Sequence, residues 1–231
     1  MTIPYRPVAR LLSRTLHPTP QVDISAVEPL LRTLENDQPR TGILLTINHY
    51  SAPGYQAWWT AILPSACIPI EIHWVMTAGW TNSGWLTGLT HWLFPRAAKL
   101  FGFTPMPAMP PHPDEAELRA SAVRSVLKYA RQTGHPVVGL APEGRDTPGG
   151  ILGALPPGVG RFILLLSQDC PQILPVGIWK DNGCIQLKFG SPYRLDVPDG
   201  LSAAERDDLV GKTIMRHIAE LLPDHLRGEY T

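Results

Sequence analysis

Two short polar clusters contain the residues whose types and spacing suit proton transfer or anion binding. The first, residues 48–54, begins with Asn48 and His49 directly after the apolar run 42–47 and continues through Ser51. An imidazole has an ordinary pKa of about 6.5, so His49 can accept a proton at neutral pH. A second interpretation is that His49 only satisfies a neighbouring backbone group.

The second cluster is the tetrapeptide 143–146, which follows the apolar run 136–141. Gly144 permits close approach of a ligand to the backbone, and Arg145 can donate two parallel hydrogen bonds to a phosphate. Glu143 completes the candidate binding set. The alternative is an ordinary turn with a surface ion pair.

Other common catalytic motifs are absent from the sequence. There is no Gly-x-Ser-x-Gly elbow, no phosphate-binding loop that ends in Lys-Ser/Thr, and no complete dinucleotide loop. Eight histidines and three cysteines occur without metal-ligand spacing. We therefore expect no metal site and no resident cofactor.

Hydrophobic patterning predicts how these clusters are positioned. Apolar runs predict buried strands, and longer stretches with helical spacing predict helices between them. The expected strands are 42–47, 71–77, 136–141, 173–179 and 184–189, and the expected helices are 25–34, 55–63, 114–133, 160–168 and 202–222. This alternation predicts an α/β fold with a mostly parallel central sheet flanked by helices, and the turn 181–183 predicts one antiparallel pair. Ligands bind beyond the carboxyl ends of strands in such sheets, where both clusters lie.

Three local signals refine these helices. Pro95 is expected to break or kink any helix in 85–103, and the proline-rich stretch 105–113 is expected to be an extended loop. Asp114 and Glu117 have capping-box spacing, with Gly134 as a stop signal. Ser202 and Glu205 repeat the capping-box spacing.

Charge is balanced over the chain and depleted in one stretch. The 20 basic and 20 acidic residues give a formal net charge of zero, which disfavours a nucleic-acid binder. Residues 41–113 contain three charged residues, Glu71, Arg96 and Lys99, and six of the seven tryptophans. No apolar run is long enough to span a bilayer as a helix. The stretch is either a buried core or a face that contacts lipid, because tryptophan favours the membrane interface.

The N-terminal residues predict a short helix with a basic side and an apolar side. Arginines recur at Arg6, Arg10 and Arg14, and four apolar residues lie between or after them, namely Val8, Leu11, Leu12 and Leu16. Such an amphipathic helix can lie on an anionic membrane surface or dock on the domain. Residues 1–14 lack the apolar stretch of a secretory signal, and the cysteine count is odd. These features favour a reducing, cytoplasmic location.

Taken in order, the clusters resemble motifs of the glycerolipid acyltransferase family, the enzymes that acylate lysophosphatidic acid and related acceptors. Asn48-His49 resembles the start of the family's His-x4-Asp motif, and residues 142–145 resemble its Pro-Glu-Gly-Thr-Arg motif. Pro157-Gly158 and the segment 174–178 resemble the later blocks, so the likeness covers 42–193.

The resemblance implies a 1-acylglycerol-3-phosphate acyltransferase-like fold and reaction. His49 would be the general base that activates an acceptor hydroxyl. The hydroxyl would attack the thioester of acyl-CoA or acyl carrier protein. Glu143, Gly144 and Arg145 would bind the acceptor phosphate, and Asn48 and Ser51 would line the same site. The acceptor would be a lysophospholipid or glycerolipid-like molecule, and the protein would be peripheral on the inner face of a membrane.

Three departures from the family pattern leave alternatives open. Gly54 stands where the motif has Asp, the Thr before the motif Arg is missing, and residues 103–108 contain no basic side chain. The first hypothesis is an active acyltransferase in which another carboxylate, such as Glu71, Glu143 or Asp146, supports His49, or in which no carboxylate does. A weak or inactive relative that binds lipid or acyl carrier is the second hypothesis, and an enzyme for phosphate-free acceptors is the third.

We expect a single domain over residues 1–231. Within it, 1–40 is an N-terminal helical segment, 41–195 is the core, and 196–231 contains the C-terminal helix.

Overall fold

The computed structural model describes residues 2–35, 41–79, 85–108 and 112–231. The strand predicted over 71–77 and the hairpin turn predicted at 181–183 both fall within these ranges. Trp80 lies outside the described residues, and so do the last residues of the predicted N-terminal segment, 36–40.

The described strands form one sheet in the order β1-β7-β6-β2-β5-β3-β4. Every neighbouring pair is parallel except β6–β7. The strands are β1 (Gln21–Asp23), β2 (Ile43–Ile47), β3 (His73–Thr77), β4 (Thr104–Met106), β5 (Val137–Leu140), β6 (Gln172–Asp181) and β7 (Cys184–Phe189). This arrangement confirms the α/β fold with a mostly parallel sheet.

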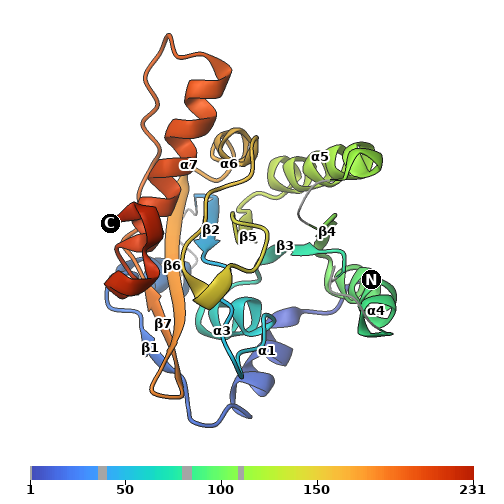
Figure 1. The fold of residues 1–231 in the computed structure, drawn as a ribbon, viewed down its shortest axis with the longest axis vertical. Coiled ribbons are helices and arrows are strands. Elements are labelled where there is room, and N and C mark those ends of the chain that lie inside the picture. The colour runs from blue at the N-terminus through green and yellow to red at the C-terminus, as the bar shows by residue number, and fades with distance from the viewer. Residues whose placement is uncertain (1, 36–40, 80–84, 109–111) are drawn as a thin grey trace.

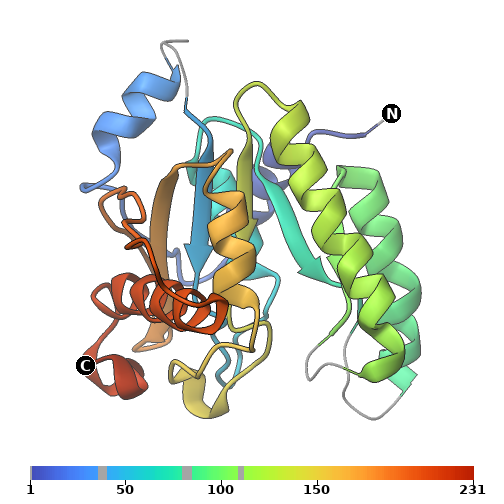
Figure 2. The ribbon, with the colours of Figure 1, turned by 90° about the horizontal axis from the view of Figure 1, so that it is seen from above.

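Helices lie on both faces of the sheet (Figures 1 and 2). They are α1 (Tyr5–Ser13), α2 (Glu28–Glu35), α3 (Trp59–Cys67), α4 (Trp85–Phe101), α5 (Ala116–Gln132), α6 (Val159–Leu166) and α7 (Ala203–Ala219). Helices α5, α6 and α7 lie on one side, whereas α1 and α3 pack together on the other. Helix α4 lies beside β4 at one edge.

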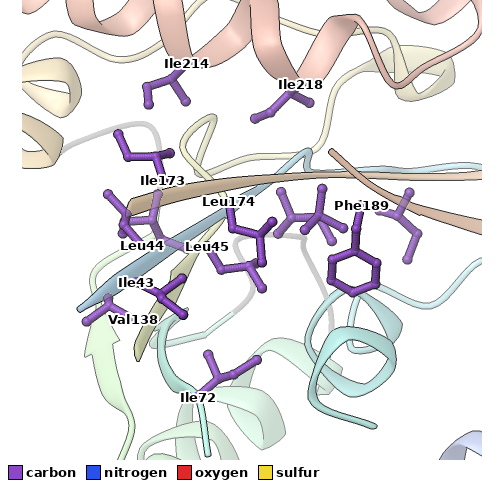
Figure 3. Packing of buried hydrophobic residues seen from close by; sticks show 14 of the residues in the cluster. Ile43, Leu44, Leu45, Ile72, Val138, Ile173, Leu174, Phe189, Ile214 and Ile218 are labelled. Atoms are coloured by element: carbon purple, nitrogen blue, oxygen red, sulfur yellow. The ribbon is translucent and has the colours of Figure 1, made fainter. Parts of the chain in front are cut away.

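The core is built around the central strand β2. All five of its residues are buried, as expected for a parallel strand covered on both faces. Figure 3 shows Ile214 and Ile218 of α7 above the sheet and Ile72 on its opposite side. Both helical residues are 0% exposed, so β2 ends in a well-packed and rigid environment.

Two local predictions are confirmed by backbone geometry. Asn182 and Gly183 both have positive φ, 47° and 82°, which is the conformation that a tight hairpin turn between β6 and β7 requires. Ser202 accepts a hydrogen bond from the Glu205 backbone, and the Glu205 side chain accepts one from the Ser202 backbone. This capping box begins α7.

The prediction that Pro95 breaks or kinks its helix is wrong as to the break, because α4 continues through Pro95 from Trp85 to Phe101. A proline removes one backbone donor and crowds the carbonyls of the preceding turn. The Arg96 guanidinium donates to the Trp92 carbonyl oxygen at 2.7 Å, which supplies a hydrogen bond within that turn.

The predicted cap at Asp114 is also wrong. A 3₁₀ turn occupies Pro113–Glu115, and α5 begins after it at Ala116 without a side-chain cap. Helix α5 ends at Gln132, before Gly134, because Thr133 is already extended.

Two short edge strands lie where no strand was predicted, and one predicted helix is displaced. Strand β4 occupies part of the stretch expected to be a loop. It pairs with β3 on one side, where an edge position tolerates Pro105. Strand β1 pairs with β7 at the opposite edge, so the antiparallel strand β7 is not an edge strand of the sheet.

The helix predicted over 55–63 begins at Trp59, because turns occupy the residues before it.

Candidate active site

Asn48 ties the end of β2 to the neighbouring strand β6. Its side-chain Nδ2 donates to the Ile178 carbonyl oxygen at 2.8 Å, and its Oδ1 accepts from the Ile178 N–H at 2.8 Å. The residue is 0% exposed. Both polar groups of the amide are thus engaged with β6, and they fix the backbone that leads into His49. Binding of substrate by Asn48, predicted from the sequence, would require these bonds to open.

Glu143 joins the two polar clusters through its carboxylate. Oε2 accepts from the His49 backbone N–H at 2.6 Å, and Oε1 accepts from the Gly153 N–H at 3.0 Å. The residue is 1% exposed. Burial raises the pKa of this carboxyl, and the two backbone hydrogen bonds oppose the rise. Glu143 therefore positions His49 through its backbone, whereas its predicted contact with substrate remains untested.

The His49 ring lies beside a carboxylate from the loop that follows β5. Nδ1 of His49 is 2.8 Å from Oδ1 of Asp146. The two atoms are in close contact but do not form an aligned hydrogen bond, because Nδ1 has no hydrogen-bond partner among the described residues. The His49 side chain is 24% exposed and that of Asp146 is 58% exposed.

The three carboxylates considered for His49 thus have different roles. Asp146 contacts the ring and Glu143 holds the backbone. Glu71 lies at the start of α1, where its carboxylate accepts from the backbone N–H groups of Tyr5 and Arg6 at 3.0 and 3.2 Å. A carboxylate at the start of a helix is favourable there because of the orphan N–H groups and the helix dipole.

Gly54, where the family motif has its acid, lies next to a cation. The residue has φ of 73°, and a Cβ atom added there would be 3.1 Å from Nζ of Lys180. Lys180 donates to the Pro53 carbonyl oxygen at 3.2 Å. The position where the family motif has its acid therefore lies next to the ammonium group of Lys180.

The remaining predicted site residues lie on the same two loops. Gly144 lines an apolar cavity beside His49, and its N–H donates to the Ala141 carbonyl oxygen at 3.2 Å. Ser51 is half-buried in the loop after β2. Arg145 is exposed at the tip of its loop and makes no hydrogen bond or ion pair with any residue that the structure describes. The structure thus brings His49, Glu143 and Gly144 together and leaves Arg145 at the rim.

An apolar cavity of about 710 Å³ opens beside His49. That volume is typical of a site for a small organic ligand. Its wall is mainly apolar and comes from β3, the β4 segment, and helices α3 to α6. Representative lining residues are Trp74, Met76, Phe94, Phe101, Phe103 and Phe162. An imidazole at the edge of an apolar chamber can act on a polar group attached to a long apolar chain.

Arg119 of α5 is a cation in the cavity wall that the sequence reasoning missed. Its guanidinium donates to the carbonyl oxygens of Pro107 and Ala108, both at 3.1 Å, and lies 3.6 Å from Glu115. Residues 103–108 contain no basic side chain, yet this arginine from the next helix lies against them. The sequence shows that Arg119 lies four residues after Glu115, but it does not indicate that Arg119 lines the cavity.

The loop that contains Asp146 is held by the C-terminal end of the chain. The Leu152 N–H donates to the Leu226 carbonyl oxygen at 2.8 Å, and the Tyr230 hydroxyl donates to the Gly153 carbonyl oxygen at 3.4 Å. Leu226 is itself 4% exposed. The contact between Asp146 and His49 therefore depends on packing against residues distant in sequence.

No family model and no curated protein matches this chain. Within the described ranges, no three His, Cys, Asp or Glu side chains cluster as metal ligands would. No described helix combines the length and apolarity needed to cross a membrane.

Proposed function

We propose that this protein is an acyltransferase. It would move a fatty acyl group from acyl-CoA or acyl carrier protein to a hydroxyl of a lysophospholipid or glycerolipid-like acceptor. The observation that carries the proposal is the position of the His49 ring, between the Asp146 carboxylate and the apolar cavity. The carboxylate supplies the orientation that a general base needs, and the cavity supplies room for an acyl chain.

The proposed reaction needs one base and no covalent enzyme intermediate. A hydrogen on Nδ1, the nitrogen that faces the Asp146 carboxylate, leaves the lone pair of the neutral imidazole on Nε2. Nε2 takes the proton of the acceptor hydroxyl while the hydroxyl oxygen attacks the thioester carbonyl carbon. The carbon–sulfur bond then breaks, and the leaving thiolate takes the proton back from His49. The products are an ester and a free thiol.

The resemblance to glycerolipid acyltransferases supports the same reaction with a rearranged acid. Gly54 lacks the carboxylate of the His-x4-Asp motif. When residues 142–146 are aligned with Pro-Glu-Gly-Thr-Arg, Asp146 falls at the arginine position and Arg145 at the threonine position. In the proposed enzyme the supporting acid thus comes from the second loop, and the phosphate-binding cation is displaced by one residue toward the rim.

The decisive experiment measures thiol release from acyl-CoA with a panel of lysolipid and simple alcohol acceptors. We expect acceptor-dependent release by the wild-type protein and a loss of about 10³-fold or more in His49→Ala, because general-base catalysis contributes about 10²- to 10⁴-fold. His225→Ala, an exposed histidine near the C-terminus, is the matched control and should retain full activity.

Two results would count against the proposal. Transfer that survives His49→Ala would remove the proposed base. Tight binding of acyl-CoA or lipid by a wild-type protein that transfers nothing to any acceptor would instead support the lipid-binding hypothesis.

A further inference from the structure

Large apolar side chains are exposed along the outer side of α4. Trp92 is 55% exposed, Leu93 is 45% exposed and Leu100 is 44% exposed. Ile3, which is 48% exposed, lies beside them because its N–H donates to the Leu100 carbonyl oxygen at 2.9 Å. We refer to these four residues together with Arg96 and Lys99 as the α4 face. Figures 1 and 2 show α4 at the margin of the molecule.

The α4 face is continuous with the cavity beside His49. Leu93 belongs to both, because it lines the cavity and is nearly half exposed. Trp58, just before α3, also lines the cavity and is 47% exposed. Leu93 and Trp58 thus give the cavity wall two apolar side chains that also reach the surface.

The charge of this face has one sign. The Arg96 guanidinium lies 4.1 Å from the centre of the Trp92 ring, and Lys99 is exposed one turn further along α4. None of the residues from Trp85 to Phe101 is acidic. The nearest acid in the sequence stretch 41–113 is Glu71, whose carboxylate is bound at the start of α1. The face is thus locally cationic on a chain with no net charge.

We propose that the α4 face docks on an anionic lipid bilayer and that acyl chains pass from the bilayer into the cavity between Trp58 and Leu93. Tryptophan favours the membrane interface, and lysine and arginine are attracted to anionic headgroups. The passage of acyl chains rests on the proposed function, whereas the docking does not. Lysine is depleted at protein–protein interfaces, so the exposed Lys99 favours a lipid surface over a second protein.

Co-sedimentation with vesicles tests the docking. We expect the wild-type protein to bind vesicles of equal parts phosphatidylcholine and phosphatidylglycerol and to bind pure phosphatidylcholine vesicles more weakly. The double variant Trp92→Glu/Leu100→Glu should lose at least about tenfold in binding, because two apolar anchors are replaced by acids. The matched control is Val22→Glu/Ile24→Glu, two exposed apolar residues at the opposite edge of the sheet. It should bind like the wild type.

A second variant tests the charges without changing the apolar anchors. Arg96→Ala/Lys99→Ala should lose about fivefold in binding to the anionic vesicles for each charge removed, with little change on neutral vesicles. Both double variants should stay folded, as a single cooperative thermal transition would show, and should keep their thiol release with a short-chain acyl-CoA and a water-soluble acceptor. Neither Trp92 nor Leu100 lines the cavity.

The proposal is overturned if Trp92→Glu/Leu100→Glu binds anionic vesicles as well as the wild type, or if the wild type binds none. It is also overturned if gel filtration shows that this variant converts a dimer into a monomer without affecting vesicle binding, because a second copy would then cover the face. Vesicle binding that depends on Trp92, in a protein without acyl transfer to any acceptor, would keep the docking and reject the proposed function.

Discussion

His49 obtains its partner from a residue that the usual motif spacing does not point to. The Asp146 carboxylate reaches Nδ1 from the loop after β5, while the turn at Gly54 has no acid and lies against Lys180. An acid introduced at Gly54 would meet this ammonium group first. In the proposed reaction, the acid beside His49 is therefore Asp146 and not a residue close to His49 in sequence.

Asp146→Asn should lower kcat about 10- to 10³-fold with a smaller effect on KM. An amide can hold the ring in the wrong tautomer and cannot stabilise the imidazolium, and in a serine-protease triad the same change costs about 10⁴-fold. The smaller loss is expected here because Asp146 is 58% exposed. Steady-state thiol release measures the effect, with Asp208→Asn on the surface of α7 as the control. An unchanged kcat would show that the contact has no catalytic role.

Arg145→Ala should raise KM about tenfold for acceptors with a phosphate and leave phosphate-free acceptors unchanged. The reason is that Arg145 is exposed at the loop tip and can pair with a phosphate outside the cavity. Comparing lysophosphatidic acid with a monoacylglycerol gives the measurement, and Arg124→Ala on α5 is the control. If KM for both acceptors is unaffected, the phosphate does not bind at Arg145.

At the scale of elements, the loop after β5 is bound to other segments at both of its ends, and we call this arrangement the clamp. Glu143 joins its start to His49, and Leu152 and Gly153 join its end to the C-terminal turns. Only a loop held at both ends can keep an exposed Asp146 near the ring.

Gly228→Ala should loosen this clamp. The added Cβ would lie 2.5 Å from the Leu152 carbonyl oxygen, at a residue with φ of 58°. We expect a loss of about 2 to 3 kcal/mol in the free energy of unfolding and a fall in kcat, because the C-terminal turn must move away from the loop. Gly200→Ala has a similar φ of 86° but nothing within 4 Å, so it should cost about 1 kcal/mol and leave kcat unchanged. Equal effects of the two substitutions would reject the clamp.

At the scale of the whole molecule, His73 makes stability depend on pH. The ring stacks on Tyr129 with centres 3.9 Å apart, and Nε2 lies 2.9 Å from the Thr104 hydroxyl oxygen. Burial lowers the pKa of His73 to about 4, and a hydrogen bond with the Gly102 backbone opposes the shift. This histidine thus joins β3, β4 and α5 in its neutral form.

The unfolded chain binds a proton at this histidine with a pKa of about 6.5, so the stabilisation is complete above that pH. It is lost as the pH falls toward 4, by about 2 to 3 kcal/mol. His73→Phe should be less stable at pH 7.5, because the Thr104 hydroxyl loses its partner, but should lose less stability between pH 7.5 and 4.5. Urea unfolding at the two pH values measures this difference, with the exposed His225→Phe as the control. A wild-type pH dependence in His73→Phe would assign the effect to other groups.

The local structure of this protein was largely readable from its residues. The Asn182-Gly183 turn, the Ser202–Glu205 capping box and the buried run of β2 each depend on residues a few positions apart. Turn dihedrals, helix caps and hydrophobic periodicity act over that same short range, so they could be predicted. The sequence also placed His49 and Glu143 just beyond the carboxyl ends of two predicted strands, and the structure shows that these strands, β2 and β5, are neighbours.

Only the tertiary structure decided which carboxylate faces the imidazole, that Glu143 is engaged with two backbone N–H groups, and that Arg119 reaches the cavity. Pro95 inside α4 and the edge strand at Pro105 belong to the same group. Each of these depends on how elements distant in sequence pack. Such packing is set by the shape of the whole core, and spacing along the chain does not encode it.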